Sequence, residues 1–265
     1  MRKDGRDFIG WTDAGGRYRQ ETRLLRDGRL LPVFVLENRT TDRRFLLTNP
    51  DGYSLTYNGL VVVAEKRRSH GWQAFGSYTL STAYGLQASS GAPASGAQAS
   101  TVAPPPAPAG LTFGRDPNDL TDARGRLPND RPHVFRAMGS VDVHRTGFVV
   151  AANFQHFSGK PWAATAVVSL PQNAQQRILL EPRGSRRLSS QSLLDVRLSR
   201  AVALKGVGRV ELILDVLNAL NDTAEEGLVT DILQTETHAN ANFGRPNVFI
   251  DPRRAMLSVR LTLGR

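Results

Sequence analysis

The chain contains 265 residues, of which 40% are apolar and 22% charged, and it contains no cysteine. This length can bury a hydrophobic core in one or two domains, and the lack of cysteine excludes disulfide frameworks, thiolate metal sites and cysteine nucleophiles. The formal net charge is +10 and 30 of the 34 cationic residues are arginine, so nucleic acid and anionic lipid are reasonable partner classes. Apolar runs are short and residues 1–30 contain Arg and Asp throughout, so we expect neither a transmembrane helix nor a secretory signal there. The composition remains compatible with a β-barrel membrane protein, because the alternating strands of such a protein give a weak hydropathy signal.

Alternation with a period of two residues recurs along most of the chain, whereas helical periodicity is scarce, so the sequence predicts an all-β fold. Residues 1–52 are expected to contribute two to four strands, around Arg17–Leu36 and Arg44–Leu47. Seven further strands are predicted at Tyr53–Arg67, Gly71–Tyr84, His133–Val143, Gly147–Phe157, Ser192–Ala203, Arg209–Leu220 and Arg254–Leu263.

The connections between these strands alternate strictly between short and long. Links of three or four residues join the members of each predicted hairpin, whereas residues 85–132, 158–191 and 221–253 form long loops. Short turns at one end and long loops at the other are typical of transmembrane β-barrels. Residues 86–110 are rich in Ala, Ser, Gly and Pro, and this composition predicts a disordered low-complexity loop within the barrel region.

Most predicted strands place apolar and charged residues on opposite faces. In the first hairpin, parity groups Leu55, Tyr57, Gly59, Val61 and Val63 with Trp72, Ala74, Gly76, Tyr78 and Leu80 on the apolar face. The opposite face is expected to carry the charges Arg136, Asp142, Asp195, Arg197, Arg209, Glu211, Asp215 and Arg260. Glu65, Arg67 and Arg200 break the rule near strand ends.

This segregation fits a membrane-spanning sheet, because Arg or Lys on a lipid face costs about 2–4 kcal/mol at the bilayer midplane. A soluble antiparallel sandwich with one packed face and one wet face gives the same alternation. Strand length and the loop rhythm favour the membrane interpretation. Aromatic residues near predicted strand ends could form an interfacial girdle: Tyr53, Trp72, Tyr84 and Phe157.

Several segments together resemble the C-terminal barrel region of TonB-dependent outer-membrane receptors, especially the Oar-like group. They occur in the order found in that family, over about four fifths of the chain. The segments are Tyr57–Ser81, Phe113–Val143, Ser158–Trp162 (SGKPW), Asp195–Leu204 (DVRLSRAVAL), Leu214–Asp222 (LDVLNALND) and Phe243–Leu263.

The resemblance implies that residues 1–265 are the C-terminal part of a receptor barrel of about 22 strands. The fold expected is therefore an antiparallel transmembrane β-barrel segment, forming an open arc of a larger barrel in the outer membrane of a Gram-negative-type bacterium. The implied partners are the N-terminal remainder of the receptor with its plug and other strands, the lipid bilayer, a large solute ligand, and TonB through the intact parent only. A smaller porin or adhesion-type barrel and a soluble β-sandwich binding module are the alternatives.

No catalytic, cofactor-binding or metal-binding residue is predicted, no ligand-binding residue can be named, and an enzyme is not expected. Walker, H-E-x-x-H and G-x-S-x-G motifs are missing, and the five histidines are scattered. Gly206-Val207-Gly208 is interpreted as a hairpin turn between strands. A solvated turn is favoured over a calcium site for Asp116, Asn118, Asp119 and Asp122, because Leu120-Thr121 interrupt the EF-hand pattern. Nucleic acid is not an expected partner, because stacking aromatics on a basic face are lacking.

Two geometric expectations follow for the sheet. The strand Arg254–Leu263 is expected to leave its outer edge unpaired, so that the sheet is open, and all three long loops should lie at one rim. The concave face should carry Arg197, Arg209, Glu211 and Arg260. Backbone pairing of the last strand with the first would instead favour the small porin.

Overall fold

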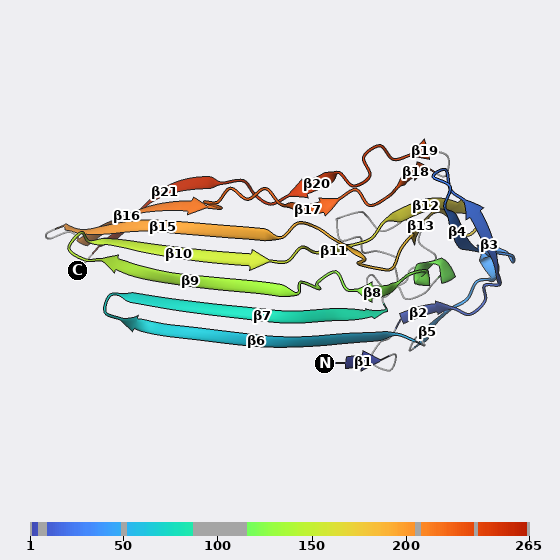
Figure 1. Cartoon of the computed structure of the whole chain (residues 1–265), viewed down its shortest axis with the longest axis horizontal. Coiled ribbons are helices and arrows are strands. Elements are labelled where there is room, and N and C mark those ends of the chain that lie inside the picture. Colours follow the sequence, from blue (N-terminus) through green and yellow to red (C-terminus); the bar gives the residue numbers. More distant parts are fainter. Residues whose placement is uncertain are drawn as a thin grey trace.

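The computed structural model describes residues 2–4, 10–48, 52–86, 116–204, 208–235 and 238–263 of the chain. Seven long strands build one antiparallel sheet in which each strand pairs with its neighbour along the chain (Figure 1). They are β6 (Ser54–Ser69), β7 (Trp72–Leu86), β9 (His133–Val143), β10 (Phe148–Phe157), β15 (Gln191–Leu204), β16 (Gly208–Leu217) and β21 (Arg254–Leu263). All seven were predicted from the sequence, and the bounds of β9 and β21 agree at both ends.

Two short strands extend this sheet. β1 (Arg2–Asp4) pairs with the first residues of β6, and β8 (Arg124–Arg126) pairs with the last residues of β7. Among the described residues, no ladder joins β21 to β1 or β6, so closure of the sheet into a barrel is not shown.

The remaining strands form small antiparallel pairs beyond one end of the long sheet, the end opposite its short turns (Figure 1). They are β2 (Gly10–Asp13) with β5 (Phe45–Thr48), β3 (Tyr18–Leu24) with β4 (Leu30–Leu36), β11 (Pro161–Trp162) with β14 (Arg186–Arg187), β12 (Thr165–Leu170) with β13 (Asn173–Leu179), β17 (Glu225–Leu228) with β20 (Pro246–Phe249), and β18 (Leu233–Thr235) with β19 (His238–Ala239). The 3-10 helices η2 (Thr40–Asp42) and η3 (Pro117–Leu120) complete this region, which we call the loop cap.

The loop cap corrects two expectations. The described part of residues 1–52 contains five strands rather than two to four, and the described parts of 158–191 and 221–253 form antiparallel strand pairs instead of loops without strands. The described parts of all three long connections do lie at one end of the sheet, as predicted (Figure 1). Leu86 ends β7, and the rest of the low-complexity segment 86–110 lies outside the described residues.

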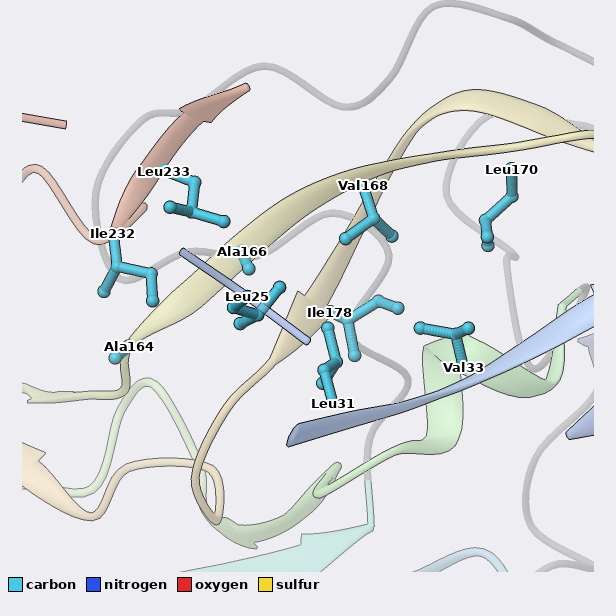
Figure 2. Close-up of a cluster of buried hydrophobic side chains, with 10 residues drawn as sticks. All are labelled: Leu25, Leu31, Val33, Ala164, Ala166, Val168, Leu170, Ile178, Ile232 and Leu233. Atoms are coloured by element: carbon cyan, nitrogen blue, oxygen red, sulfur yellow. The ribbon is translucent and has the colours of Figure 1, made fainter. Parts of the chain in front are cut away.

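The hydrophobic core lies in the loop cap and not in the long sheet (Figure 2). Ten buried side chains contribute to it: Leu25, Leu31, Val33, Ala164, Ala166, Val168, Leu170, Ile178, Ile232 and Leu233. They come from segments up to about 200 residues apart in sequence, so the β3–β4 hairpin and the two connections 158–191 and 221–253 share one packed core.

The register of the β6–β7 hairpin differs from the expected one. Its turn places His70 and Gly71 at positive φ, as a two-residue type I′ turn requires, and a bulge lies between Lys66 and Ser69. Leu60 and Val62 therefore lie opposite Leu80 and Tyr78, whereas Val61 and Val63 lie opposite Thr79 and Ser77. The predicted faces of β6 were wrong by one residue, because a one-residue shift moves every side chain to the other face.

Among the residues that the structure describes, no helix is long and apolar enough to cross a membrane.

Candidate functional site

The two faces of the long sheet differ in chemistry, and the strand registers define them. Residues opposite one another across a ladder project to the same side, and all eight charges expected on one face share it. We call this the polar face and the other the apolar face. The corrected register also moves Glu65 to the polar face, opposite Phe75, and leaves Lys66 on the apolar face near the strand end.

In the long sheet the apolar face is the more exposed of the two, whereas a soluble sheet buries its apolar face against the core. On β16, Ile213 and Asp215 of the polar face are 5% and 7% exposed, whereas Leu212 and Leu214 of the apolar face are 51% and 40% exposed. On β21 the residues of both faces are exposed, and Leu257 of the apolar face is 76% exposed. No second layer of described residues packs on this face, so its leucines and valines face the surroundings.

Polar or cationic side chains bound the apolar face at both ends of β10 and β15. Near the loop cap, His156 Nδ1 lies 2.9 Å from Ser192 Oγ, and near the short turns the guanidinium of Arg200 lies 5.1 Å from the centre of the Phe148 ring. These pairs are eight residues apart on each strand, and only apolar residues occupy the apolar face between them: Val150, Ala152, Phe154, Leu194, Val196 and Leu198. Eight residues span about 26 Å along a strand, or about 20 Å across a membrane at a tilt near 40°. That height is close to the apolar band of about 25 Å in outer-membrane barrels.

Neighbouring strands carry similar boundary residues. The Tyr78 hydroxyl lies 2.7 Å from His133 Nδ1 on the loop-cap side, and Lys66 Nζ lies 4.3 Å from the centre of the Trp72 ring on the turn side. Trp72 and Tyr84 lie on the apolar face at opposite ends of β7, as an aromatic girdle requires. Tyr53 is buried and Phe157 lies on the polar face, so their assignment to a girdle was wrong.

The polar face is hollowed, and two pairs of its charges lie across neighbouring strands. Arg197 donates two hydrogen bonds to Asp215, at 2.6 and 2.9 Å, and Arg260 donates to Glu211 at 3.2 Å. A groove of about 660 Å³ lies on this face. Its lining includes Phe75, Met138, Asn153, Arg197, Asp215 and Met256. Such a surface can line an aqueous path, because water or a polar solute can hydrogen-bond to side chains that the ion pairs have already oriented.

A buried carboxylate fixes the loop cap to the strand ends. Asp130 is 1% exposed and accepts a hydrogen bond of 2.6 Å from the Ala83 amide. Arg126 and Arg187 form ion pairs with its other oxygen. This network joins the end of β7, the segment before β9 and β14, and hydrogen bonds to a charged acceptor are stronger than neutral ones.

A second network surrounds Glu226 in the loop cap. Lys160 and Gln191 donate hydrogen bonds to its carboxylate, and Arg131 lies 3.7 Å away. Burial alone raises the pKa of Glu226, but these donors and the neighbouring cations outweigh it and hold the pKa below its ordinary value. Glu226 is therefore charged at neutral pH and connects β17 to the segments that precede β11 and β15.

The residues considered for calcium have a structural role instead of forming a solvated turn. Asp116, Asn118 and Asp119 are buried, and Asn118 both accepts from the Phe34 amide and donates to the Phe34 carbonyl, each at 2.8 Å. Asp116 caps η3 by accepting from the Asn118 amide. In the described part of the chain, no group of three or more His, Asp or Glu residues could hold a metal ion.

Sequence reasoning identified the turn residues but missed the buried polar network. Asn218 and Asn221 have positive φ after β16, as turn-forming amides do, and Pro132 precedes β9 where it need not donate to the ladder. Gly208 begins β16 and the β15–β16 ladder closes at Leu204, consistent with a short connection there. Nothing local marks Asp130 or Asn118 as buried, because the Ala83 amide bonded to Asp130 and the Phe34 amide bonded to Asn118 lie tens of residues away.

No known protein family and no curated protein matches the chain. Among solved structures, it is similar to P. aeruginosa FpvA bound to a heterologous pyoverdine with iron, at 13% sequence identity and a TM-score of 0.43. FpvA is a TonB-dependent receptor. The match covers 92% of this chain and 23% of that chain, so the chain spans about a quarter of the receptor. The likeness is distant, and we base no functional step on it.

Proposed function

We propose that this chain forms part of the wall of an outer-membrane β-barrel receptor of the TonB-dependent type, which takes up a large solute. One observation carries the proposal: the long antiparallel strands expose an apolar face whose height matches a membrane. Polar side chains bound this face at both ends, and the other face of the strands is polar. A soluble sandwich would bury that apolar face under a second sheet.

The direction of the strands argues against the small-porin alternative. Seven long strands alternate in direction, so β6 and β21 run parallel to each other. Closing the sheet between them would create a parallel seam, whereas bacterial outer-membrane barrels are antiparallel throughout. β1 runs antiparallel to β21 but offers only three residues. We therefore propose that an odd number of further long strands, from the N-terminal remainder of the receptor, lies between β21 and β6.

In this proposal the faces and the loop cap have separate tasks. The apolar face contacts lipid, the polar face lines the lumen beside the plug, and the loop cap contributes to capture of the solute on the outer side. TonB would act on the intact parent only. We propose no catalytic step and no nucleic-acid partner.

Flotation of the full chain with phospholipid vesicles tests membrane association. The proposal expects the chain to float with vesicles and to aggregate without detergent, because exposed edges of apolar strands associate. A monomer that is soluble without detergent and does not float would contradict it. The DNA upstream of the Met1 codon tests the receptor assignment: an open frame encoding further strands and a plug supports it, and a promoter directly before Met1 contradicts it.

A further inference from the structure

The turn side of the sheet is rich in cations. Among the described residues near the short turns, seven cations accompany three carboxylates. The cations are Lys66, Arg67, Arg68, Arg145, Arg200, Arg209 and Arg260; the carboxylates are Glu65, Asp142 and Glu211.

Each of the three carboxylates already has an arginine. Arg68 lies 2.5 Å from Asp142, Arg260 lies 3.2 Å from Glu211, and Arg67 lies 3.9 Å from Glu65. Within the described part of the chain, the four other cations form no ion pair: Lys66, Arg145, Arg200 and Arg209. No described carboxylate therefore competes with an external anion at these four cations, although Lys66 also donates hydrogen bonds to Ser69 Oγ and to the carbonyls of Arg67 and Ser69.

Three of these four cations lie where lipid headgroups would be. Lys66 and Arg200 lie on the apolar face, over the rings of Trp72 and Phe148, and Arg145 is exposed in the turn between β9 and β10. Arg200 reaches toward this turn, because a Cβ on Gly147 would lie 4.0 Å from its Nε. Arg209 lies on the polar face, away from the lipid.

The opposite boundary of the apolar face has a different chemistry. Its two polar pairs, Tyr78 with His133 and His156 with Ser192, contain no arginine or lysine. Many arginines of the loop cap pair with carboxylates, such as Arg187 with Asp130 and Arg177 with Asp231. At β9, β10 and β15 the two boundaries therefore differ in positive charge, whereas at β7 the loop-cap boundary has Arg126 beside Tyr84 and Arg124 beside Leu86.

We propose that the turn side of the apolar face binds the headgroups of anionic phospholipids, with Lys66 on β6 at one position and Arg145 with Arg200 at another, on the far side of β7 and β9. This inference rests on the proposed function, because it requires the apolar face to lie in a bilayer. Phosphate oxygens accept from ammonium and guanidinium groups, while the acyl chains of the same lipid contact Trp72, Phe148 and the neighbouring valines. A soluble phosphate ester would gain only the first of these contacts.

Fluorescence quenching of Trp72 in vesicles tests both the insertion of the apolar face into lipid and the preference of its turn side for anionic headgroups. The full chain is reconstituted with brominated phosphatidylglycerol or brominated phosphatidylcholine, and a Trp72→Phe variant identifies the signal of this residue. We expect both lipids to quench Trp72, and phosphatidylglycerol to associate at least about fivefold more strongly, the effect of one cation near an anionic surface.

Matched variants assign the preference to the three cations. In Lys66→Gln/Arg145→Gln/Arg200→Gln the ratio of the two association constants should fall to about one, whereas Arg209→Gln, with an equally unpaired cation on the polar face, should keep it. Quenching by phosphatidylcholine verifies that each variant is inserted. If phosphatidylcholine does not quench Trp72 in the triple variant, Arg145→Gln alone is used. It should lower the ratio of the two association constants without disturbing the fold, because the Arg145 side chain is exposed.

The quenching results distinguish failure of the headgroup site from failure of the proposed membrane wall. Equal quenching by both lipids, or a preference that survives in the triple variant, would overturn the headgroup site and leave the membrane wall intact. Quenching by neither lipid would contradict the proposed function itself.

Discussion

An arginine placed on the apolar face should destabilise the chain according to its depth. Val196 lies on β15 midway between Ser192 and Arg200, about 13 Å along the strand from each. Val202 lies on the same face of the same strand, two residues beyond Arg200. Val196→Arg therefore places a guanidinium near the proposed midplane, whereas Val202→Arg places it in the headgroup region.

The expected losses differ by a measurable amount. An arginine at the midplane costs about 2–4 kcal/mol, and one near the interface about 0–1 kcal/mol. The larger loss corresponds to a change of about 30-fold to 900-fold in the unfolding equilibrium. The two variants share the same substitution, strand and face, so differences in strand propensity and charge largely cancel.

Guanidinium unfolding of the full chain in phospholipid vesicles, followed by tryptophan fluorescence, measures both losses. The account expects Val196→Arg to lose at least about 1 kcal/mol more than Val202→Arg. A soluble surface would tolerate either change within about 0.5 kcal/mol. Equal losses in the two variants would refute the assignment of the apolar face to lipid.

Three further predictions concern the loop cap. Ile178→Ala should cost about 2–5 kcal/mol, because Ile178 is fully buried in the core, and should raise the rate of proteolysis within residues 158–191, while Leu220→Ala at an exposed position should not. Asn118→Ala removes the acceptor of the Phe34 amide and one of the two donors to the Phe34 carbonyl, which keeps its hydrogen bond from Gln172, and should cost about 2 kcal/mol; unchanged hydrogen exchange at the Phe34 amide would contradict this. Because folding lowers the pKa of Glu226, its carboxylate adds to the free energy of unfolding at pH values above the ordinary pKa of 4.5. This stabilisation is lost as the pH falls through the folded pKa. Protease resistance of the cap should decline over that acidic range, and Glu226→Gln should show a smaller decline than the unmodified chain.

The long strands could be predicted because their pattern is local. β9 and β21 alternate apolar and polar residues over most of their length, so their bounds follow from the sequence. β6 alternates poorly through Leu60–Val63, and the turn at His70-Gly71 with the preceding bulge decides its register. The extra residue in the bulge between Lys66 and Ser69 was enough to exchange the faces of β6.

The loop cap was harder to predict from the sequence, because its stability depends on contacts between residues that are far apart along the chain. Leu25, Val33, Ile178 and Leu233 pack together although long connections separate them in sequence. The short apolar runs Ala166–Leu170 and Ile178–Leu180 were a usable signal for a hairpin, but they were included in a segment interpreted as a loop. The polar face could be predicted by parity, whereas the groove and its ion pairs required the cross-strand register.

A cysteine scan along β21 tests the central claim most directly, because the chain contains no cysteine of its own and every residue of this strand is exposed. Single cysteines at positions 257 to 261, labelled with an environment-sensitive fluorophore, would be compared in vesicles. The account predicts blue-shifted emission at Leu257→Cys, Val259→Cys and Leu261→Cys, and emission typical of water at Ser258→Cys and Arg260→Cys. Emission typical of water at all five positions would contradict a membrane-facing wall.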